Sequence, residues 1–286
     1  MKKFNVLSLF NGISCGRLAL DRAIIPVRNY ISYEIDKYAN MISQHHYPDD
    51  IYYGDVLSTN FKEIDMKIDL LLGGSPCTYW SIAHPSNTRE TDHNGLGFEL
   101  FMGYVKALKR KKPTYFLYEN NFSIHQNIKD KITDQLGVNP LCFNSNIVSA
   151  QNRTRLYWTN IKMKNLLHDR NIFFKDIYDR SLPFRPMTKY LLGYRGDRSR
   201  RQRMALFSDL KAPCLTTKRD HTEVLFLSED QKTFRPLSEI EYEILQTLPI
   251  NYTLVPGVAM THRYKGIGNG WTVDIVAHIL RQIHYQ

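Results

Sequence analysis

Cysteine and long apolar runs are both scarce in this sequence. Four of the 286 residues are cysteines, and they lie far apart with no Cys-x-x-Cys pair. We therefore expect neither a disulfide framework nor a zinc knuckle, and no bound metal. No stretch approaches the roughly 18 apolar residues of a membrane span, and Asn5 and Asn11 come too early for a secretory signal. We expect a cytoplasmic protein without a membrane partner.

Positive charge is abundant and concentrated. The 38 Lys and Arg residues exceed the 28 Asp and Glu residues, which gives a formal net charge of +10. Residues 162–220 contain 15 basic and 6 acidic residues, which leaves 23 against 22 in the rest of the chain. Such a basic segment suits binding to a polyanion, because phosphate contacts supply most non-specific affinity. Charge alone leaves a solvated basic surface or a localisation signal equally open.

Short apolar strands alternate with helical segments through the first half of the chain. The expected strands cover 4–10, 28–34, 68–74 and 114–120, and the expected helices lie around 18–24 and over 36–46 and 98–111. Alternation at this spacing predicts an α/β fold with a doubly wound, mostly parallel sheet. Such sheets bind ligands at the carboxyl ends of their strands.

The alternation stops near residue 161. The following chain is basic and Arg-rich, which indicates a second, smaller domain of irregular, β-containing structure. Apolar residues at helical spacing over 273–283 predict an amphipathic helix that returns to the first domain. We therefore expect a discontinuous first domain of residues 1–161 and 265–286, and a second domain of residues 162–264.

Three features near the N-terminus describe a nucleoside pocket. LFNGISCG (9–16) places Gly12 and Gly16 between a strand and a helix, where backbone can approach a ligand. Glu34, at the end of the next strand, could accept hydrogen bonds from a ribose diol, and Asp55 of GDV could accept one from an exocyclic amine. Each feature alone is more often solvated loop structure, but their order favours a nucleoside.

The segment GGSPCTYWS (73–81) follows a buried strand. Its glycines and Pro76 predict a stiff turn that presents the Cys77 thiol at the carboxyl edge of the sheet. A lone cysteine is more often a small core residue, but this placement favours a nucleophile. Glu119 ends the next strand, so the two side chains could act as nucleophile and proton donor on one heterocycle.

The segment SAQNRTRLYW (149–158) has the alternation of a strand. It would carry Gln151, Arg153 and Arg155 on one face of the sheet. Two arginines on one strand face could also be ordinary surface charges, so the residues alone leave both interpretations open.

Taken in order, these motifs resemble those of the DNA cytosine-5 methyltransferases over almost the whole chain. LFNGISCG resembles the family's methionine-binding motif, YEID its ribose motif, GDV its adenine motif, SPC its nucleophile motif, YEN its proton-donor motif and QNRTR its Gln-x-Arg-x-Arg motif. FRPLSEIEYEILQTLP (234–249) resembles the motif that supports the recognition domain, and GNGWTVDIVAHIL (268–280) resembles the last cofactor-side motif. Thr78 after the Pro-Cys pair is closer to the animal de novo enzymes, and Asn121 replaces the usual valine.

The resemblance implies a covalent mechanism on cytosine. Cys77, presented by Pro76, would add to carbon 6 of the ring, and Glu119 would protonate or hydrogen-bond ring nitrogen 3. Arg155 would anchor the carbonyl at carbon 2. Arg153 and Gln151 would support the loop.

The resemblance also implies a methyltransferase fold with S-adenosylmethionine as cofactor. The residues expected around it are Phe10, Asn11, Gly12, Gly16, Glu34, Ile35, Asp55, Val56, Leu100 or Phe101, Asn269 and Trp271.

Duplex DNA is the partner that the resemblance implies, with the target base flipped out of the stack. This would bring a cytoplasmic enzyme to the nucleoid or nucleus, and a partner restriction nuclease stays open. Five arginines of the basic segment are expected to contact bases or phosphates, namely Arg195, Arg198, Arg200, Arg201 and Arg203.

Three alternatives to a DNA methyltransferase stay in view. The same chemistry could act on tRNA, because one branch of the family modifies RNA and a 2′-hydroxyl contact leaves no sequence signal. A silent DNA-binding homologue would have no need for Cys77, Glu119 and Arg155 together. A nicotinamide-dependent oxidoreductase is disfavoured by the absence of Gly-x-Gly-x-x-Gly.

Overall fold

The computed structural model describes residues 2–81, 89–186, 204–206, 208–217, 224–228, 230 and 232–286. These residues form two compact units. The first unit comprises residues 1–143, 154–166 and 273–286, and the second comprises residues 144–153 and 167–272. The boundaries of the two units differ from the expected domain boundaries. Residues 144–153 and 265–272, which we expected in the first domain, group together in the second unit. Arg153 Nη2 donates hydrogen bonds to the carbonyl oxygens of Gly268 and Gly270, which ties these two segments to each other.

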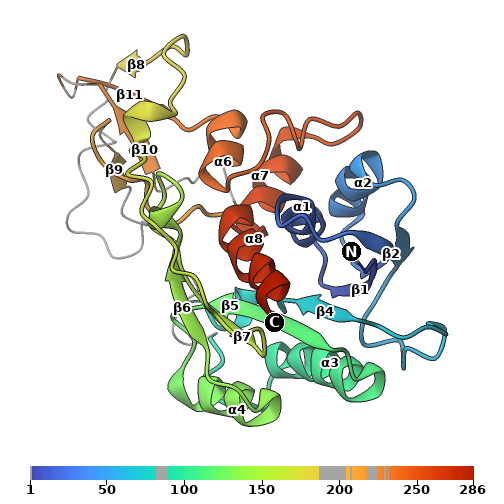
Figure 1. The fold of residues 1–286 in the computed structure, drawn as a ribbon. Coiled ribbons are helices and arrows are strands. Elements are labelled where there is room, and N and C mark those ends of the chain that lie inside the picture. The colour runs from blue at the N-terminus through green and yellow to red at the C-terminus, as the bar shows by residue number, and fades with distance from the viewer. Residues whose placement is uncertain are drawn as a thin grey trace. The chain divides into compact units, whose positions relative to one another are not determined.

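A seven-stranded sheet forms the centre of the first unit, in the order β3-β2-β1-β4-β5-β7-β6 (Figure 1). The strands are β1 (Phe4–Leu9), β2 (Val27–Tyr33), β3 (Ile51–Tyr53), β4 (Leu70–Gly73), β5 (Tyr115–Asn121), β6 (Leu141–Asn144) and β7 (Thr154–Thr159). The pairs from β3 to β5 are parallel, and β7 runs antiparallel to β5. The predicted mostly parallel sheet is therefore confirmed, and its order reverses between β1 and β4, where ligands bind in such folds.

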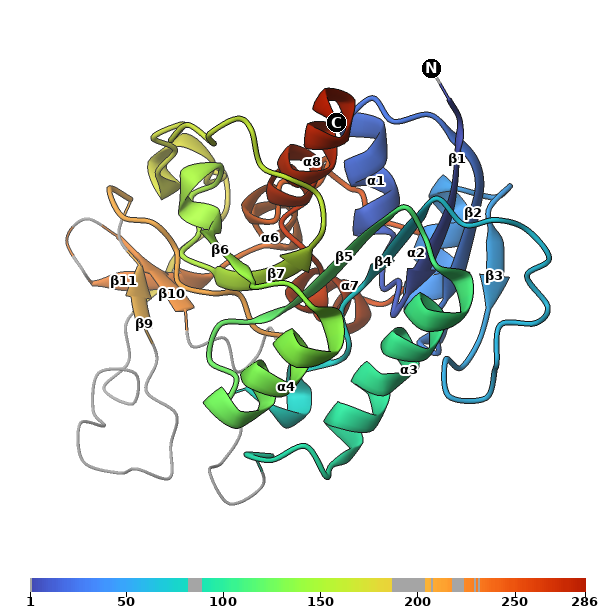
Figure 2. The same cartoon turned by 60° about the horizontal axis from the view of Figure 1, so that its bottom comes forward.

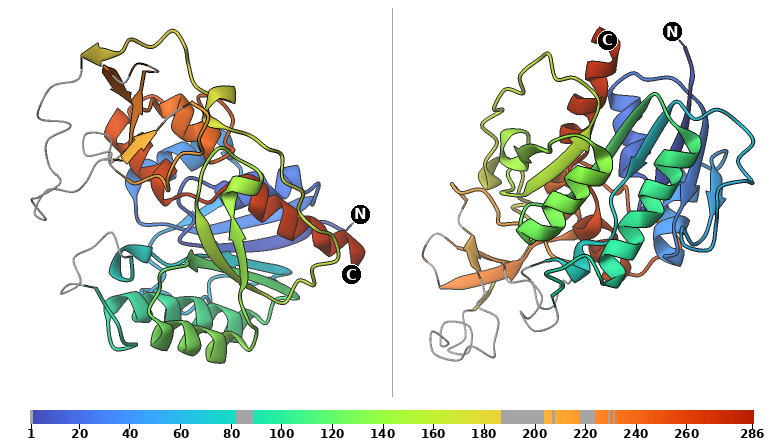
Figure 3. Two further views of the ribbon diagram at one scale, coloured as in Figure 1. Left: turned by 90° about the vertical axis from the view of Figure 1, so that its left-hand side faces the viewer. Right: turned by 90° about the horizontal axis from the view of Figure 1, so that it is seen from below.

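Helices cover both faces of this sheet (Figure 2). The helices α3 (Leu96–Lys111) and α4 (Gln126–Leu136) lie on one face, and α1 (Cys15–Arg22), α2 (Lys37–His46) and α8 (Val273–Arg281) lie on the other (Figure 3). Local chemistry sets their ends. Asp36 Oδ1 accepts the N–H groups of Tyr38 and Ala39 at the start of α2, and Gly137 adopts a φ of 68° at the end of α4.

The returning helix α8 packs beside α1, as the helical spacing predicted. Arg22 on α1 forms an ion pair with Asp274 on α8 at 2.6 Å, and the Arg281 guanidinium donates to the carbonyl of Arg22 at 3.0 Å. These contacts join residues that are more than 250 positions apart in the chain. The first unit is therefore discontinuous in sequence.

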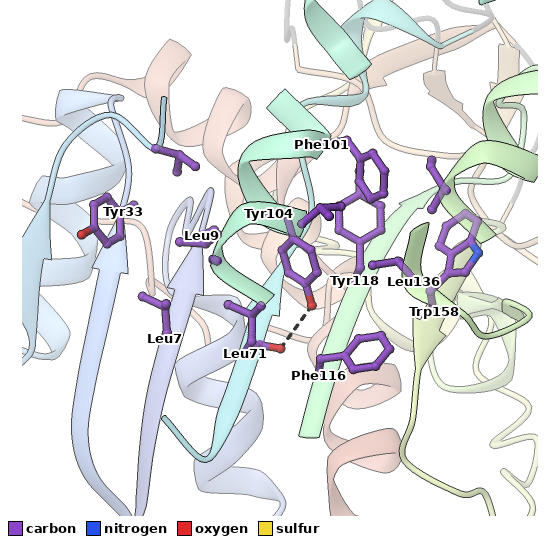
Figure 4. Packing of buried hydrophobic residues seen from close by; sticks show 14 of the residues in the cluster. Leu7, Leu9, Tyr33, Leu71, Phe101, Tyr104, Phe116, Tyr118, Leu136 and Trp158 are labelled. Carbon is purple, nitrogen blue, oxygen red and sulfur yellow. Dashed lines mark hydrogen bonds between the residues drawn. The ribbon is translucent and has the colours of Figure 1, made fainter. Parts of the chain in front are cut away.

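Aromatic rings fill the core between the sheet and α3 (Figure 4). Tyr118 of β5 is surrounded by Phe101, Tyr104 and Trp158, with ring centroids 5.1, 5.0 and 5.9 Å away. All four side chains are fully buried. Each such ring removes a large apolar area from water, so the cluster gives β5 a well-defined position against α3.

Among its described residues, the second unit contains a small sheet in the order β8-β11-β10-β9 and the helices α6 and α7. Its elements are β8 (Arg185–Pro186), β9 (Met204–Leu206), β10 (Val224–Leu227), β11 (Thr233–Pro236), α6 (Glu239–Leu245) and α7 (Met260–Asn269). The guanidinium of Arg235 lies 2.6 Å from a carboxylate oxygen of Glu241 and 5.0 Å from the ring centroid of Phe226. This buried ion pair links β11, α6 and β10 within the unit.

Candidate active site

The side chains expected at the site follow neighbouring strands. In the sheet order β3, β2, β1, β4 and β5, the residues beyond the strand ends include Asp55, Glu34, Gly12 and Cys77, and Glu119 lies near the end of β5. The last residues of these parallel strands pair in register, as Leu9 does with Tyr33 and with Gly73. The structure therefore places the five groups in order along one edge of one sheet.

The loop after β1 is held in shape by Asn11. Its Oδ1 accepts hydrogen bonds from the hydroxyls of Ser8 and Tyr30, both at 2.9 Å, and its Nδ2 donates to Ser14 Oγ at 2.9 Å. The Asn11 side chain is buried, so these bonds stabilise the loop from inside.

Backbone conformation opens the same loop to a ligand. Phe10, Gly12 and Ser14 have φ values of 56°, 56° and 62°, in the left-handed region. No atom lies within 4 Å of the position that a Cβ would take at Gly12. Gly16 is buried in the first turn of α1.

Glu34 connects this loop to the one after β2. Its Oε2 accepts the N–H of Gly12 at 2.8 Å, and its Oε1 accepts the N–H of Asp36 at 2.8 Å. Each carboxylate oxygen has a second lone pair, so the group can still accept a ligand hydroxyl. The neighbouring Ile35 side chain is 77% exposed, although it is large and apolar.

The remaining expected cofactor residues of the first unit differ in exposure. Asp55 is exposed, and its Oδ1 accepts the N–H of Leu57. Leu100 is half-buried, whereas Val56 and Phe101 belong to the buried core. Side-chain contact with a ligand is therefore open to Asp55 and Leu100, whereas the side chains of Val56 and Phe101 are packed in the core.

These groups fit S-adenosylmethionine. The open backbone at Gly12, the Glu34 and Asp55 carboxylates and the exposed Ile35 side chain suit a nucleoside, which has a polar diol, an exocyclic amine and an apolar base face.

Cys77 begins a short 3₁₀ turn (Cys77–Tyr79) after β4, and its side chain is half-buried. Its carbonyl oxygen accepts the N–H groups of Trp80 and Ser81 at 3.0 and 2.9 Å. The indole of the buried Trp80 donates to Glu90 at 3.0 Å, and the other oxygen of Glu90 accepts the N–H of Gly97. The turn is therefore anchored to the start of α3.

Glu119 and Arg155 meet across β5 and β7. Arg155 Nε lies 3.2 Å from Glu119 Oε1, and the two side chains are 11% and 13% exposed. In the antiparallel register Asn121 lies opposite Arg155, so Glu119, Asn121 and Arg155 share one face of the strand pair. An acidic and a basic group are thus held together beside the Cys77 turn, because β4 and β5 are adjacent.

The expected strand over 149–158 is wrong in its first half. The strand β7 begins at Thr154, so Gln151 and Arg153 do not share a strand face with Arg155. Both are buried in the second unit, where Gln151 donates to the carbonyl of Leu245 at 3.0 Å and accepts from the N–H of Leu215 at 3.0 Å. Their polar side chains form hydrogen bonds with backbone groups that are distant in the sequence. The alternation of residue types along the sequence does not reveal such tertiary contacts.

The other expected residues lie in the second unit or outside the described residues. Asn269, at the end of α7, is exposed, and Trp271 is half-buried. The five arginines of the basic segment, Arg195, Arg198, Arg200, Arg201 and Arg203, fall outside the described residues.

Sequence reasoning missed the supporting residues of the site, above all Ser75, Tyr118 and Asn120. The buried hydroxyls of Ser75 and Tyr118 lie 2.6 Å apart, and Asn120 Nδ2 donates to the Ser75 carbonyl at 3.1 Å. The usable signal was the two-residue period of β5, which turns Tyr118 and Asn120 away from the Glu119 face.

In the part of the chain that the structure describes, no three His, Cys, Asp or Glu side chains are grouped so that they could hold a metal ion. Within the same residues, no helix has the length and apolar character needed to cross a membrane.

Residues 4–189, more than half of the chain, match the family model of the C-5 cytosine-specific DNA methylases. The chain therefore belongs to this family, which confirms the predicted resemblance. The orphan methyltransferase M.SPRI of Bacillus phage SPR is 36% identical over 123 residues, which are 42% of this chain and 27% of that protein. The type II methyltransferase M.NlaIV of Neisseria lactamica is 30% identical over 129 residues, 42% of this chain and 28% of that protein. The matched region thus spans about a quarter of each relative's length.

Solved structures resemble the whole chain. The Entamoeba histolytica methyltransferase EhMeth has a TM-score of 0.77 at 17% identity and covers 100% of this chain and 99% of its own. The Dnmt2 methyltransferase of S. pombe has a TM-score of 0.74 at 16% identity, with 98% of both chains covered. At this identity the likeness shows the fold, which is that of a methyltransferase.

Proposed function

We propose that this protein transfers a methyl group from S-adenosylmethionine to carbon 5 of cytosine in duplex DNA, with Cys77 as the nucleophile. The observation that carries the proposal is the placement of Cys77 after β4 and of Glu119 near the end of the adjacent strand β5, where Glu119 pairs with Arg155 of β7. The Gly12, Glu34 and Asp55 groups follow at the same sheet edge. A nucleophile, a proton donor and a nucleoside site are thus neighbours.

Cofactor binding is assigned to the loops after β1, β2 and β3. The Gly12 backbone would approach the cofactor, Glu34 would accept from the ribose hydroxyls, Asp55 would accept from the adenine amine, and Ile35 would cover the base. When bound, S-adenosylmethionine supplies a sulfonium methyl group that an activated ring carbon can accept.

Cytosine must first be activated, because its carbon 5 is a weak nucleophile. The Cys77 thiolate adds to carbon 6. The electron pair of the 5,6 double bond shifts toward carbon 4, and negative charge develops on nitrogen 3. Glu119 in its protonated form donates to nitrogen 3, which neutralises the negative charge and leaves an enamine that is nucleophilic at carbon 5. Arg155, already beside Glu119, would donate to the carbonyl oxygen at carbon 2.

The ring is restored by elimination after carbon 5 has been methylated. The proton on carbon 5 is lost to water, its bonding electrons restore the 5,6 double bond, the carbon–sulfur bond breaks, and Cys77 leaves as thiolate. Glu119 recovers the proton from nitrogen 3. The protein residues therefore end the cycle in their starting protonation states.

The description of the matching family model, C-5 cytosine-specific DNA methylase, supports DNA as the substrate. We assign target selection to the second unit, because the segment 162–220 carries 15 basic against 6 acidic residues and all of it from residue 167 onward lies in that unit. Duplex stacking hides carbon 6 from a side chain, so the target base must leave the helix.

Bisulfite sequencing of DNA and tRNA from cells that express the wild type or Cys77→Ala tests this function. Cytosines in a fixed sequence context of DNA should resist conversion only with the wild type. Resistant cytosines in tRNA alone would replace the DNA assignment, and an equal pattern with Cys77→Ala would overturn the role of Cys77.

A further inference from the structure

The strand β5 has two faces with different contacts. Glu119 lies on the face that meets Arg155, whereas Tyr118 and Asn120 point to the opposite face, toward α3. The Tyr118 hydroxyl shares a hydrogen bond of 2.6 Å with Ser75 Oγ, and Asn120 Nδ2 lies 3.2 Å from the same hydroxyl. The proton donor and the contacts to Ser75 therefore come from consecutive residues of one strand.

Ser75 is the last buried residue before Cys77. Besides its hydroxyl contact with Tyr118, its carbonyl oxygen accepts from Asn120 Nδ2 at 3.1 Å. Only Pro76 separates it from Cys77, and the proline ring restricts φ, which is −49° here. Because Pro76 has little rotational freedom about φ, a displacement of Ser75 also displaces the backbone of Cys77.

The Tyr118 hydroxyl is a fixed point in the core. Its ring is fully buried and packs against Phe101, Tyr104 and Trp158 (Figure 4). Burial raises the pKa of the Tyr118 phenol well above its usual value, so the group stays a neutral hydroxyl that can donate and accept.

We propose that Tyr118 is a positioning residue for Cys77. Its hydroxyl and the Asn120 amide hold Ser75 in place. Because Tyr118 and Asn120 flank Glu119 on β5, these contacts set the distance and direction of the Cys77 thiol from Glu119. The expected effect on catalysis rests on the proposed function. The expected effect on the position of the Cys77 turn rests only on the contacts of Ser75. Tyr118 belongs to the YEN motif, but the resemblance gives a role in that motif to Glu119 alone.

The test compares Tyr118→Phe with Tyr104→Phe in the full chain. Tyr104 is an equally buried tyrosine of the same cluster, and its hydroxyl donates to the carbonyl of Leu71, in the middle of β4 (Figure 4). Both variants lose one buried hydroxyl and keep the ring. Only Tyr118→Phe removes a contact with the segment that leads to Cys77.

The catalytic measurement is the single-turnover rate of covalent adduct formation with DNA that contains 5-fluorocytosine. Tyr118→Phe should lower this rate by about 10-fold or more, as expected for a misplaced reactive group, with cofactor and DNA affinities changed less than about twofold. Tyr104→Phe should stay near the wild-type rate. Ser75→Ala should show a similar loss, and the double variant Ser75→Ala/Tyr118→Phe should lose little more than either single one.

The structural measurement is hydrogen exchange of a peptide that contains Trp80 and Ser81, whose N–H groups donate to the Cys77 carbonyl. Exchange there should be faster in Tyr118→Phe and unchanged in Tyr104→Phe. This readout applies even if the wild type methylates no nucleic acid, so failure of the proposed function is distinguishable. Unchanged exchange in Tyr118→Phe, or equal effects of both variants on exchange and adduct rate, would overturn the inference.

Discussion

Glu34 accepts the backbone N–H of Gly12 through Oε2 at 2.8 Å, so one carboxylate joins the loops that follow β1 and β2. The same side chain accepts the N–H of Asp36 at 2.8 Å, just before α2. A group proposed to bind ribose is therefore also part of the frame that shapes its pocket.

Replacing Glu34 by alanine should weaken S-adenosylmethionine binding by about 1–3 kcal/mol, because a charge-assisted hydrogen bond and a loop connection are lost. Calorimetry measures the change directly. The control is Glu99→Ala, an exposed glutamate in the first turn of α3. Unchanged affinity in both Glu34→Ala and Asp55→Ala would place the cofactor elsewhere.

The thiol of Cys77 should form an adduct with 5-fluorocytosine DNA that survives denaturing electrophoresis, because fluorine at carbon 5 blocks the elimination. Cys77→Ala should bind DNA and cofactor and trap nothing. Cys142→Ala, which removes an exposed cysteine on β6, should trap DNA as the wild type does. An adduct with Cys77→Ala would show that another residue is the nucleophile.

Glu119→Gln should reduce the methylation rate by about 10²–10⁴-fold, since the amide cannot transfer a proton to nitrogen 3. Its effect on cofactor affinity should be small, because Glu119 lies at the end of β5 and the cofactor loops follow β1, β2 and β3. Rapid-quench methylation assays with separate binding measurements check both points. The control is Glu99→Gln, the same replacement at another glutamate. Equal methylation rates in the two variants would show that Glu119 takes no part in the reaction.

Asp50 should make folding stability depend on pH. Burial raises the pKa of its carboxyl to about 6, although Arg17 opposes the shift. The folded state therefore holds this proton more tightly than the unfolded state, and stability should fall as the pH rises from about 4 to about 6. The contribution to the unfolding free energy is about 1–3 kcal/mol.

Urea unfolding of Asp50→Asn between pH 4 and 6 measures this contribution. The stability of this variant should not fall across that range. In the control Asp49→Asn, which replaces the exposed neighbouring residue, stability should fall as it does in the wild type. An identical pH slope in wild type and Asp50→Asn would contradict the assignment.

The basic segment should contribute to DNA affinity through counterion release. A variant with Arg198, Arg200, Arg201 and Arg203 replaced by alanine should bind DNA more weakly, with the salt slope lowered by about one for each lost phosphate contact. Loss of a base-reading arginine should instead relax one target position at a cost of about 1–3 kcal/mol. Unchanged affinity, salt dependence and methylation pattern would favour a solvated surface.

Much of the first unit was predictable, because its signals are local. The strands β1, β2, β4 and β5 and the helices α2 and α3 lie within a few residues of their expected positions, since apolar periodicity and turn residues act over short distances. Parallel strands then bring their carboxyl ends to one edge. The grouping of Glu34, Asp55, Cys77 and Glu119 at that edge therefore follows from the order of motifs.

The segment around QNRTR shows where such reasoning stops. Alternation suggested one strand face for Gln151, Arg153 and Arg155, but only Arg155 lies on β7. Gln151 and Arg153 instead satisfy buried carbonyl groups more than 90 residues away in sequence. Pairing with distant backbone depends on the folded chain, and no local pattern encodes it.

By itself the sequence determined the α/β class, the motif order and the chemical groups of the site, because these depend on residue identity and short-range periodicity. Tertiary structure alone decided that Arg155 pairs with Glu119, that Asn11 stabilises its loop from inside and that Tyr118 holds Ser75. The physical reason is that a buried polar group must find a partner, and which partner it finds depends on how strands and helices pack.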